Sequence, residues 1–377
     1  MSTAVHLVTK PLSPPWNDSA VNLPKYLVEY SSRTAFHILT DTNKENEILP
    51  NSDRVIVDGI YHSSNSLHLG FLNKSRLFAY LLSRLHVTKR GKNKQIFHFF
   101  YTPNTLTSLT VSLLLWRQKN TRLIHTVTSC PNLKQKRKAS SLFIRNTEVI
   151  ALSDHTRRII ESVLDKPVTR IYPGIPLPEM PTRTDIEAAR EAEGFEAGSV
   201  YLIYPGDLYF GEAMPFWRAA LPAWRARFPQ VRLVITCRTK HSLDKPCRDE
   251  IIRLGGDRVV FRDDIADLNR LFTAGDIIVF PVKSLYGKMD FPLALLEATA
   301  LGKPAVVSSF GSLQELADFG GVLGADPDRP DGFTEAIDQL ITSPEKRHEV
   351  GMQGAQVVKK HFSAEKMAEA YEKIYHG

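Results

Sequence analysis

Short apolar runs alternate with longer helical stretches along nearly the whole chain, and this alternation restarts once. In the first half, the apolar runs lie at 6–9, 35–40, 54–60, 95–100, 122–129 and 148–153. After a polar stretch at 182–198, further runs lie at 200–206, 231–237, 258–261, 276–282 and 304–309. Strands that alternate with helices at this spacing form parallel sheets covered by helices. The sequence therefore predicts an α/β protein with two doubly wound parallel-sheet lobes.

The polar stretch at 182–198 marks the expected boundary between the lobes. The chain has 377 residues, which is enough for two or three domains at roughly 100–200 residues each. We expect an N-terminal lobe over 1–175 and a C-terminal lobe over 176–360. A final helix over 361–377 is expected to pack back toward the N-terminal lobe.

Composition narrows the class of protein. The chain is 43% hydrophobic and 24% charged, which excludes a disordered or collagen-like chain. Its cysteines, Cys130, Cys237 and Cys247, show no metal-ligand spacing and indicate free thiols in a reducing compartment. The longest apolar run, 109–116, is far shorter than the roughly 20 residues of a membrane-spanning helix. We expect a cytoplasmic protein, with a peripheral position at the inner membrane face as a second option.

The two halves of the chain differ in charge. Residues 1–180 hold 24 basic and 12 acidic side chains, whereas residues 181–377 hold 24 and 29. The basic run at 134–138 is either a solvated segment or a patch for an anionic membrane or acceptor. This asymmetry suggests that the two lobes face different partners.

The stretch 276–318 carries the most specific chemical pattern, because ligands of such sheets bind at the carboxyl ends of the strands. A strand is followed by the loop KSLYGKMDFP and a helix that bears Glu297, and a second strand leads into the turn FGSLQE. Helix N-termini attract anions through unpaired N–H groups, and Lys288 adds a cation just before the first helix. The sequence therefore predicts an anion site here, with Glu297 available to accept hydrogen bonds from sugar hydroxyls.

This stretch resembles the donor site of retaining glycosyltransferases of the two-Rossmann-lobe (GT-B) type, glycosyltransferase family 4. The matching residues are Pro281, Asp290, Phe291, Pro292, Leu293, Leu296, Glu297, Ala298, Gly302, Pro304 and Glu315. Weaker matches, such as IYPGDL and RIYPGI, extend in order over nearly the whole chain. The resemblance implies two facing Rossmann-like lobes with the donor cleft between them. It also implies a nucleotide-diphosphate sugar as donor and no metal or other cofactor.

The sequence departs from the family pattern at three places. Met289 stands where the family has its first glutamate, so Asp290 next to it is expected to take over that role. Asp207, after Gly206, stands where the family places an arginine that binds the diphosphate. Thr128 replaces a histidine, which leaves His98 as the best-placed catalytic candidate in the N-terminal lobe.

The predicted site residues fall into three groups. The catalytic candidates are His98, Asp290 and Lys288. The donor-binding candidates are Arg238, Lys240, Glu297, Phe291, Pro292, Leu293, Gly206, Asp207 and Glu315, with Arg238 and Lys240 as substitutes for the missing diphosphate cations. The acceptor or lid candidates are Trp16, Asn17, Asp18, Ser19 and His125.

Several of these residues have a structural alternative. His98 can equally be a hydrogen-bonded core histidine, Asp290 a helix cap, and Glu297 a helix residue in a salt bridge. Lys288, Arg238 and Lys240 can be exposed loop cations.

The predicted function is sugar transfer with retention of configuration from a UDP- or GDP-sugar to a glycan acceptor, lipid-linked or otherwise anionic. Peripheral membrane contact through the basic lobe is a further expectation, and nucleic acid is not an expected partner. A catalytically impaired binding module with this fold is the main alternative, and a nucleotide-sugar epimerase is the second. A dinucleotide oxidoreductase is disfavoured because 12–16 contains no glycine.

Overall fold

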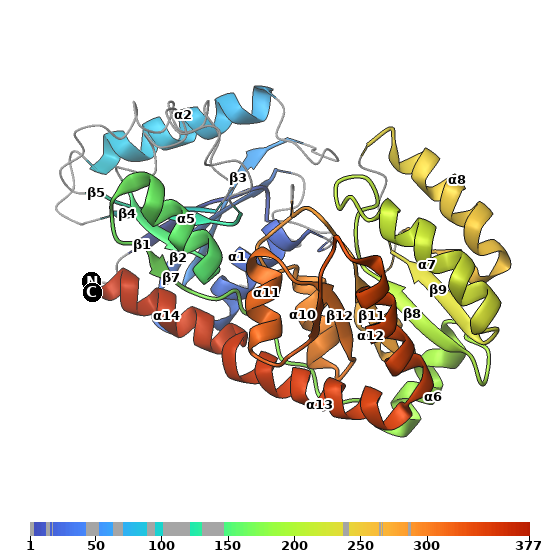
Figure 1. Ribbon diagram of the computed structural model, residues 1–377. Coiled ribbons are helices and arrows are strands. Elements are labelled where there is room, and N and C mark those ends of the chain that lie inside the picture. The colour runs from blue at the N-terminus through green and yellow to red at the C-terminus, as the bar shows by residue number, and fades with distance from the viewer. Residues whose placement is uncertain are drawn as a thin grey trace. The chain divides into compact units, whose positions relative to one another are not determined.

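The computed structural model describes residues 4–12, 16, 18–42, 53–62, 71–88, 95–100, 121–129, 147–236, 241–263, 265, 267–285 and 288–377. The chain divides into two compact units, coloured in sequence order in Figure 1. Unit 1 comprises Met1–Pro176 and Ser363–Gly377, and unit 2 comprises Leu177–Phe362. Each unit is built around one parallel sheet.

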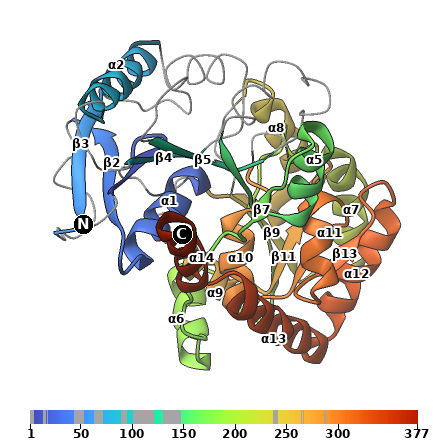
Figure 2. The same cartoon turned by 90° about the vertical axis from the view of Figure 1, so that its left-hand side faces the viewer.

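The sheet of unit 1 has seven strands within the described residues, in the order β3-β2-β1-β4-β5-β6-β7. The strands are β1 (Ala4–Val8), β2 (Ala35–Asp41), β3 (Val55–Tyr61), β4 (Gln95–Phe100), β5 (Thr121–Val127), β6 (Glu148–Ala151) and β7 (Thr169–Arg170). All pairs are parallel. The described helices are α1 (Ser19–Tyr30), α2 (Phe71–Thr88), α5 (Asp154–Leu164) and α14 (Ala364–His376). Figure 2 shows α2 beside β3, which it contacts at one edge of the sheet.

The sheet of unit 2 has six parallel strands in the part of the chain described, in the order β10-β9-β8-β11-β12-β13. They are β8 (Val200–Tyr204), β9 (Val231–Ile235), β10 (Val259–Phe261), β11 (Ile277–Phe280), β12 (Ala305–Ser308) and β13 (Leu323–Ala325). The order reverses between β8 and β11, which is the topological switch point of a Rossmann-like sheet.

The helices of unit 2 also pack on one another. Their bounds are α6 (Arg183–Ala192), α7 (Met214–Arg227), α8 (Asp244–Gly255), α9 (Leu268–Ala274), α10 (Leu293–Ala300), α11 (Gly311–Asp318), α12 (Pro330–Thr342) and α13 (Pro344–His361). Helix α7 contacts α8 and α12, whereas α9 contacts α6 and α10, and α10 also contacts α13. The predicted fold class, two Rossmann-like lobes with parallel sheets, is confirmed.

The core of each unit is formed by apolar side chains of the strands and of the helices that cover them. In unit 2, the fully buried rings of Tyr204, Trp217 and Phe280 meet between β8, β11 and α7. In unit 1, Phe97 and Phe99 of β4 lie with Tyr61 in one apolar cluster. Burial of such rings on the order of 150–250 Å² each dominates core energetics.

The last helix, α14, belongs to unit 1. A parallel bridge joins Ile175 to Ser363, and the N–H of Ala364 donates to the carbonyl of Ile175 at 2.8 Å. Glu372 of α14 is buried and accepts hydrogen bonds from the main-chain N–H groups of Arg33 at 2.6 Å and Thr34 at 3.2 Å. These contacts fix α14 against the turn between α1 and β2.

Candidate active site at the carboxyl edge of unit 2

The loops that follow β8, β11 and β12 converge at the switch point of the unit 2 sheet. Because β8 pairs with β11 and β11 with β12, the carboxyl ends of these strands lie side by side. The main-chain N–H of Lys283 donates to the carbonyl of Gly211 at 2.8 Å, which joins the loops after β11 and β8. Ligands of open α/β sheets bind in the crevice at such a position.

A buried ion pair links two of the predicted donor-site residues. Lys288 Nζ lies 2.8 Å from Asp207 Oδ2, and the two side chains are only 11% and 7% exposed. The Tyr204 hydroxyl donates to the main-chain oxygen of Asp207 at 2.6 Å, which holds the loop after β8. The alternative that Lys288 is an exposed loop lysine is therefore wrong. The Asp207 carboxylate pairs with this cation at the carboxyl edge of the sheet.

Asp290 joins the loops after β11 and β12 through its main chain. Its carbonyl oxygen accepts a hydrogen bond from the Ser312 hydroxyl in the first turn of α11. The Asp290 residue is buried, and Phe291 and Leu293 after it are almost fully buried. Pro292, not Asp290, occupies the N-cap position of α10, so the alternative that Asp290 caps this helix is wrong.

Two helices begin at this edge without a side-chain cap. Neither α10, which begins at Leu293, nor α11, which begins at Gly311, has a side-chain hydrogen bond at its N-cap among the described residues. Their first-turn N–H groups and dipoles favour an anion at this edge. Gly311 has a φ of 57°, a left-handed conformation that glycine adopts at little cost.

Glu297 and Glu315 lie on these two helices, behind their N-termini. Both residues are half-buried. Gly206 is required for space, because a Cβ there would lie 2.5 Å from a ring atom of Tyr204. Arg238 and Lys240, the predicted substitute cations, lie outside the described residues, as do Asn17 and the basic run at 134–138.

An aromatic cluster that the sequence did not predict lies after β8 and β9. Tyr209 stacks on His241 with ring centroids 4.2 Å apart and an interplanar angle of 12°, and Phe210 meets both rings edge-on. The buried Asp244 accepts from the main-chain N–H of His241 at 2.8 Å and of Tyr209 at 3.3 Å. The carboxylate thereby holds the two loops together, and Tyr209 stays 38% exposed.

His98, a predicted catalytic residue, lies in the core of unit 1. Its exposure is 0%, and its ring nitrogens face the Tyr375 hydroxyl at 2.5 Å and the Thr126 hydroxyl at 2.8 Å. Burial, with a smaller contribution from the neighbouring His125, lowers the pKa of His98 well below its usual value. Both ring nitrogens are engaged inside the unit, so the catalytic assignment of His98 is wrong and the alternative, a core histidine, holds. His125 is also fully buried.

The predicted lid residues at the start of α1 have local structural partners. Asp18 caps the helix by accepting from the Ala20 N–H at 2.9 Å, and its other oxygen pairs with Lys10 at 2.8 Å. Ser19 is the first residue of α1. The Trp16 ring lies 5.1 Å from Lys25 Nζ, a cation–π contact. Asp18 therefore acts as a helix cap. The predicted role of Trp16 in a lid over the donor or acceptor stays a prediction.

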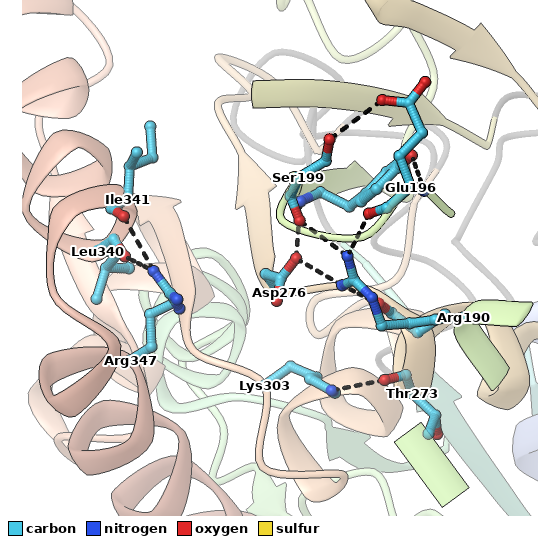
Figure 3. Close-up of polar contacts among 11 residues, drawn as sticks. Arg190, Glu196, Ser199, Thr273, Asp276, Lys303, Leu340, Ile341 and Arg347 are labelled. Atoms are coloured by element: carbon cyan, nitrogen blue, oxygen red, sulfur yellow. Dashed lines mark hydrogen bonds and ion pairs between the residues drawn. The ribbon is translucent and has the colours of Figure 1, made fainter. Parts of the chain in front are cut away.

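Charged residues also lie at the opposite, amino edge of the unit 2 sheet, where Lys303 is buried and Arg190 and Asp276 are half-buried (Figure 3). Arg190 of α6 donates to Asp276 at 3.1 Å and to the Ser199 carbonyl at 2.8 Å, while Asp276 accepts from the Tyr201 N–H at 2.8 Å. Lys303 donates to the Thr273 carbonyl at 2.7 Å. These groups satisfy one another at the edge away from the candidate site, which identifies them as structural.

The described residues lack two kinds of feature. They contain no group of three or more histidine, cysteine, aspartate or glutamate side chains arranged to hold a metal ion. None of the described helices combines the length and apolar character needed to cross a membrane.

Residues 199–343 match the family described as Glycosyl transferases group 1. This range contains all the residues that the sequence predicts to bind the donor. No curated protein sequence matches the chain.

Solved structures show the same fold across the whole chain. Anabaena Alr3699/HepE, in complex with UDP and glucose, has a TM-score of 0.76 and 16% identity over 100% of both chains. Sucrose-phosphate synthase of Thermosynechococcus elongatus has a TM-score of 0.73 and 19% identity over 100% of this chain and 98% of its own. WaaG, a glycosyltransferase involved in lipopolysaccharide biosynthesis, has a TM-score of 0.67 and 13% identity over 99% of this chain and 100% of its own. At these identities the likeness concerns the fold.

Proposed function

We propose that the chain transfers a sugar from a nucleotide-diphosphate sugar to an acceptor with retention of configuration. The proposal is supported by the match of residues 199–343 to the Glycosyl transferases group 1 domain and by the likeness of the fold to GT-B structures. The observation that carries the proposal is that this domain coincides with the converging loops of the unit 2 switch point. The same loops present Lys288 and two uncapped helix N-termini. HepE, a structural neighbour, was solved with UDP-glucose, which supports a uridine nucleotide as the first donor to test.

The proposed roles follow from the position of each residue. The diphosphate lies against Lys288 and the N-termini of α10 and α11, where positive charge gathers. Glu297 accepts hydrogen bonds from the ribose, and Asp290 lies near the transferred sugar. Arg238 and Lys240 remain predicted diphosphate contacts.

Electrostatic stabilisation of the leaving group supplies the proposed catalysis. As the glycosidic bond breaks, negative charge develops on the departing diphosphate, and fixed N–H groups and cations aimed at it lower the barrier. The acceptor then attacks from the face that the leaving group vacates, so that no nucleophilic carboxylate and no metal ion is required. We place the acceptor on the basic N-terminal half of the chain, and we expect it to be anionic.

A binding module without catalytic activity is the second candidate, and one observation favours it. Asp207 neutralises Lys288, so the site offers less net positive charge than a diphosphate-binding loop with two free cations. An inactive module predicts nucleotide-sugar binding that is weak or absent, with no turnover of any donor.

A donor screen tests the proposal. Purified protein is assayed by thermal shift with a panel of UDP- and GDP-sugars, and each stabilising donor is then assayed for hydrolysis. We expect Lys288→Ala to lower the hydrolysis rate by about 10²–10³-fold. Glu297→Gln is expected to weaken UDP binding roughly tenfold or more, since hydrogen bonds to charged groups contribute about 1.5–3 kcal/mol. The control is Glu349→Gln on the exposed face of α13. Unchanged turnover in both site variants would remove these residues from the donor site.

A further inference from the structure

One segment of the sequence holds the whole basic excess of the first half of the chain. From residue 59 to residue 147 there are 15 lysines and arginines but neither aspartate nor glutamate. The rest of residues 1–180 holds 9 basic and 12 acidic side chains. Soluble proteins usually intersperse both signs of charge on their surface. A segment of this length with a single sign of charge therefore indicates an anionic partner. We call residues 59–147 the basic segment.

Helix α2 lies within the basic segment and turns one face toward the core of unit 1. Tyr80 and Leu81 of this helix are buried in the apolar cluster that contains Phe97 of β4. The buried Asn73 accepts a hydrogen bond from the main-chain N–H of His62 at 3.1 Å and donates one to the His62 carbonyl at 3.3 Å. These contacts fix the orientation of α2 about its own axis, and thereby determine which face is turned away from the core.

The face of α2 that is turned away from the core exposes two large apolar side chains. Phe78 is 38% exposed and Leu82 is 46% exposed. Because they lie four positions apart, they are neighbours on the helix surface. Ala79 and Ser83 beside them are exposed as well. A helix that combines exposed apolar side chains with basic residues and no acidic ones is typical of helices that lie in a membrane interface. We call Phe78 and Leu82 the apolar pair.

We propose that α2 docks the protein onto an anionic lipid surface, with the apolar pair inserted among the lipid headgroups. The positive charge of the basic segment attracts the protein to the surface, and this attraction acts over about a Debye length. The apolar pair then leaves water, which adds a contribution that salt does not screen. A nucleic acid or an acidic glycan would match the charge but would leave the apolar pair in water, so a lipid surface accounts for both observations. The inference goes beyond sugar transfer and does not depend on it.

Co-sedimentation of the full chain with vesicles tests the docking. One set of vesicles contains phosphatidylcholine alone, and the other contains phosphatidylcholine and phosphatidylglycerol in equal amounts. We expect the protein to bind the mixed vesicles, to bind the neutral ones weakly or not at all, and to bind less tightly as the salt concentration rises. The double variant Phe78→Gln/Leu82→Gln keeps the charge and uses a good helix former. Its affinity for the mixed vesicles should fall by about tenfold or more, since two large apolar side chains no longer leave water.

The matched control is Ile252→Gln, which replaces an equally exposed apolar side chain, 45% exposed, on helix α8 of unit 2. It lies outside the basic segment, so its loss should leave vesicle binding unchanged.

Three results would overturn the docking. They are no binding to the mixed vesicles, equal binding to both kinds of vesicle, and a double variant that binds as tightly as the wild type. Heparin is assayed in parallel as a soluble polyanion. If heparin binds as tightly as the mixed vesicles and the double variant weakens neither, the basic segment recognises polyanions in general and the lipid surface is wrong. Should the double variant not fold, hydrogen exchange of the wild type decides, because only the mixed vesicles should slow exchange within 71–88.

Discussion

The positive charge of Lys303 lowers the stability of the folded state, because the side chain is buried. It follows α10, is buried, and donates to the Thr273 carbonyl at 2.7 Å. Burial lowers the pKa of Lys303 to about 8, with Arg190 acting in the same direction and Asp276 against it. In the unfolded chain a lysine titrates near 10.4. The unfolded state therefore binds this proton more tightly, and the folded state gains stability as the pH rises between these two values.

Replacing Lys303 should change how the free energy of unfolding depends on pH. Between pH 8 and pH 10, we expect the free energy of unfolding of the wild type to rise relative to Lys303→Met by roughly 2 kcal/mol. Urea unfolding of both proteins at several pH values measures this difference, in which the titration of all other groups cancels. A gap that stays constant over this range would mean that Lys303 keeps an ordinary pKa.

Single residues also show what sequence patterns can and cannot predict about the site. The position of Lys288 before a helix was enough to predict a cation at the carboxyl edge. Its partner Asp207 lies 81 residues away, and no local pattern encodes a pairing across that distance. The prediction that His98 is catalytic was wrong for a related reason. Its buried partner Tyr375 lies 277 residues further along the chain.

At the scale of elements, one carboxylate anchors α14 in unit 1. Glu372 accepts hydrogen bonds from the N–H groups of Arg33 and Thr34, and its side chain is 4% exposed. Burial raises the pKa of Glu372, but the hydrogen bonds from the main chain and side chain of Arg33 outweigh it and bring the pKa below its usual value. The stabilisation is therefore present above the ordinary glutamate pKa of about 4.3 and is lost as the pH falls through the lowered value.

Neutralising this carboxylate should loosen the last helix. We expect Glu372→Gln to lower the free energy of unfolding by about 2–3 kcal/mol at pH 7, since several hydrogen bonds to a charged acceptor weaken together. The difference from wild type should shrink below pH 4. Glu369→Gln, on the exposed face of the same helix, is the control and should change stability little. Equal stability of the two variants would contradict the anchoring role.

Elements differed in how well the sequence predicted them. Strands and long amphipathic helices were predicted because burial on one side produces a period in the sequence. Helices α8 and α9 were missed, since α8 is rich in charged residues and α9 has only 7 residues. The apolar residues at 321–323 predict a final short strand, but the strand lies at Leu323–Ala325, where Val306 pairs with Leu323. The helical periodicity of 105–119 predicts a helix there, but these residues lie outside the described part of the chain.

At the scale of the whole molecule, the chain passes from unit 1 to unit 2 after Pro176 and returns after Phe362. The two segments that leave and re-enter unit 1 touch there. The N–H of Gly174 contacts the Met367 sulfur at 3.0 Å, and Ile175 bridges to Ser363. A Cβ at position 174 would lie 2.5 Å from the Ser363 carbonyl oxygen and 2.6 Å from the Ala364 Cα. Both are main-chain atoms, which cannot turn aside as the end of a side chain can.

One added methyl group should therefore disturb the point where the chain re-enters unit 1. We expect Gly174→Ala to lower the free energy of unfolding by about 1–3 kcal/mol, the usual cost of overpacking, and to speed proteolysis near residue 363. Gly332→Ala is the matched control, because its Cβ meets nothing within 4 Å and it lies in α12. There, alanine should stabilise the helix by up to about 1 kcal/mol. Opposite effects of the same substitution at the two positions would separate the close contact from the general effect of losing a glycine. A Gly174→Ala variant as stable as wild type would show that the segments can part without cost, and that α14 is retained in unit 1 by Glu372 and its apolar face alone.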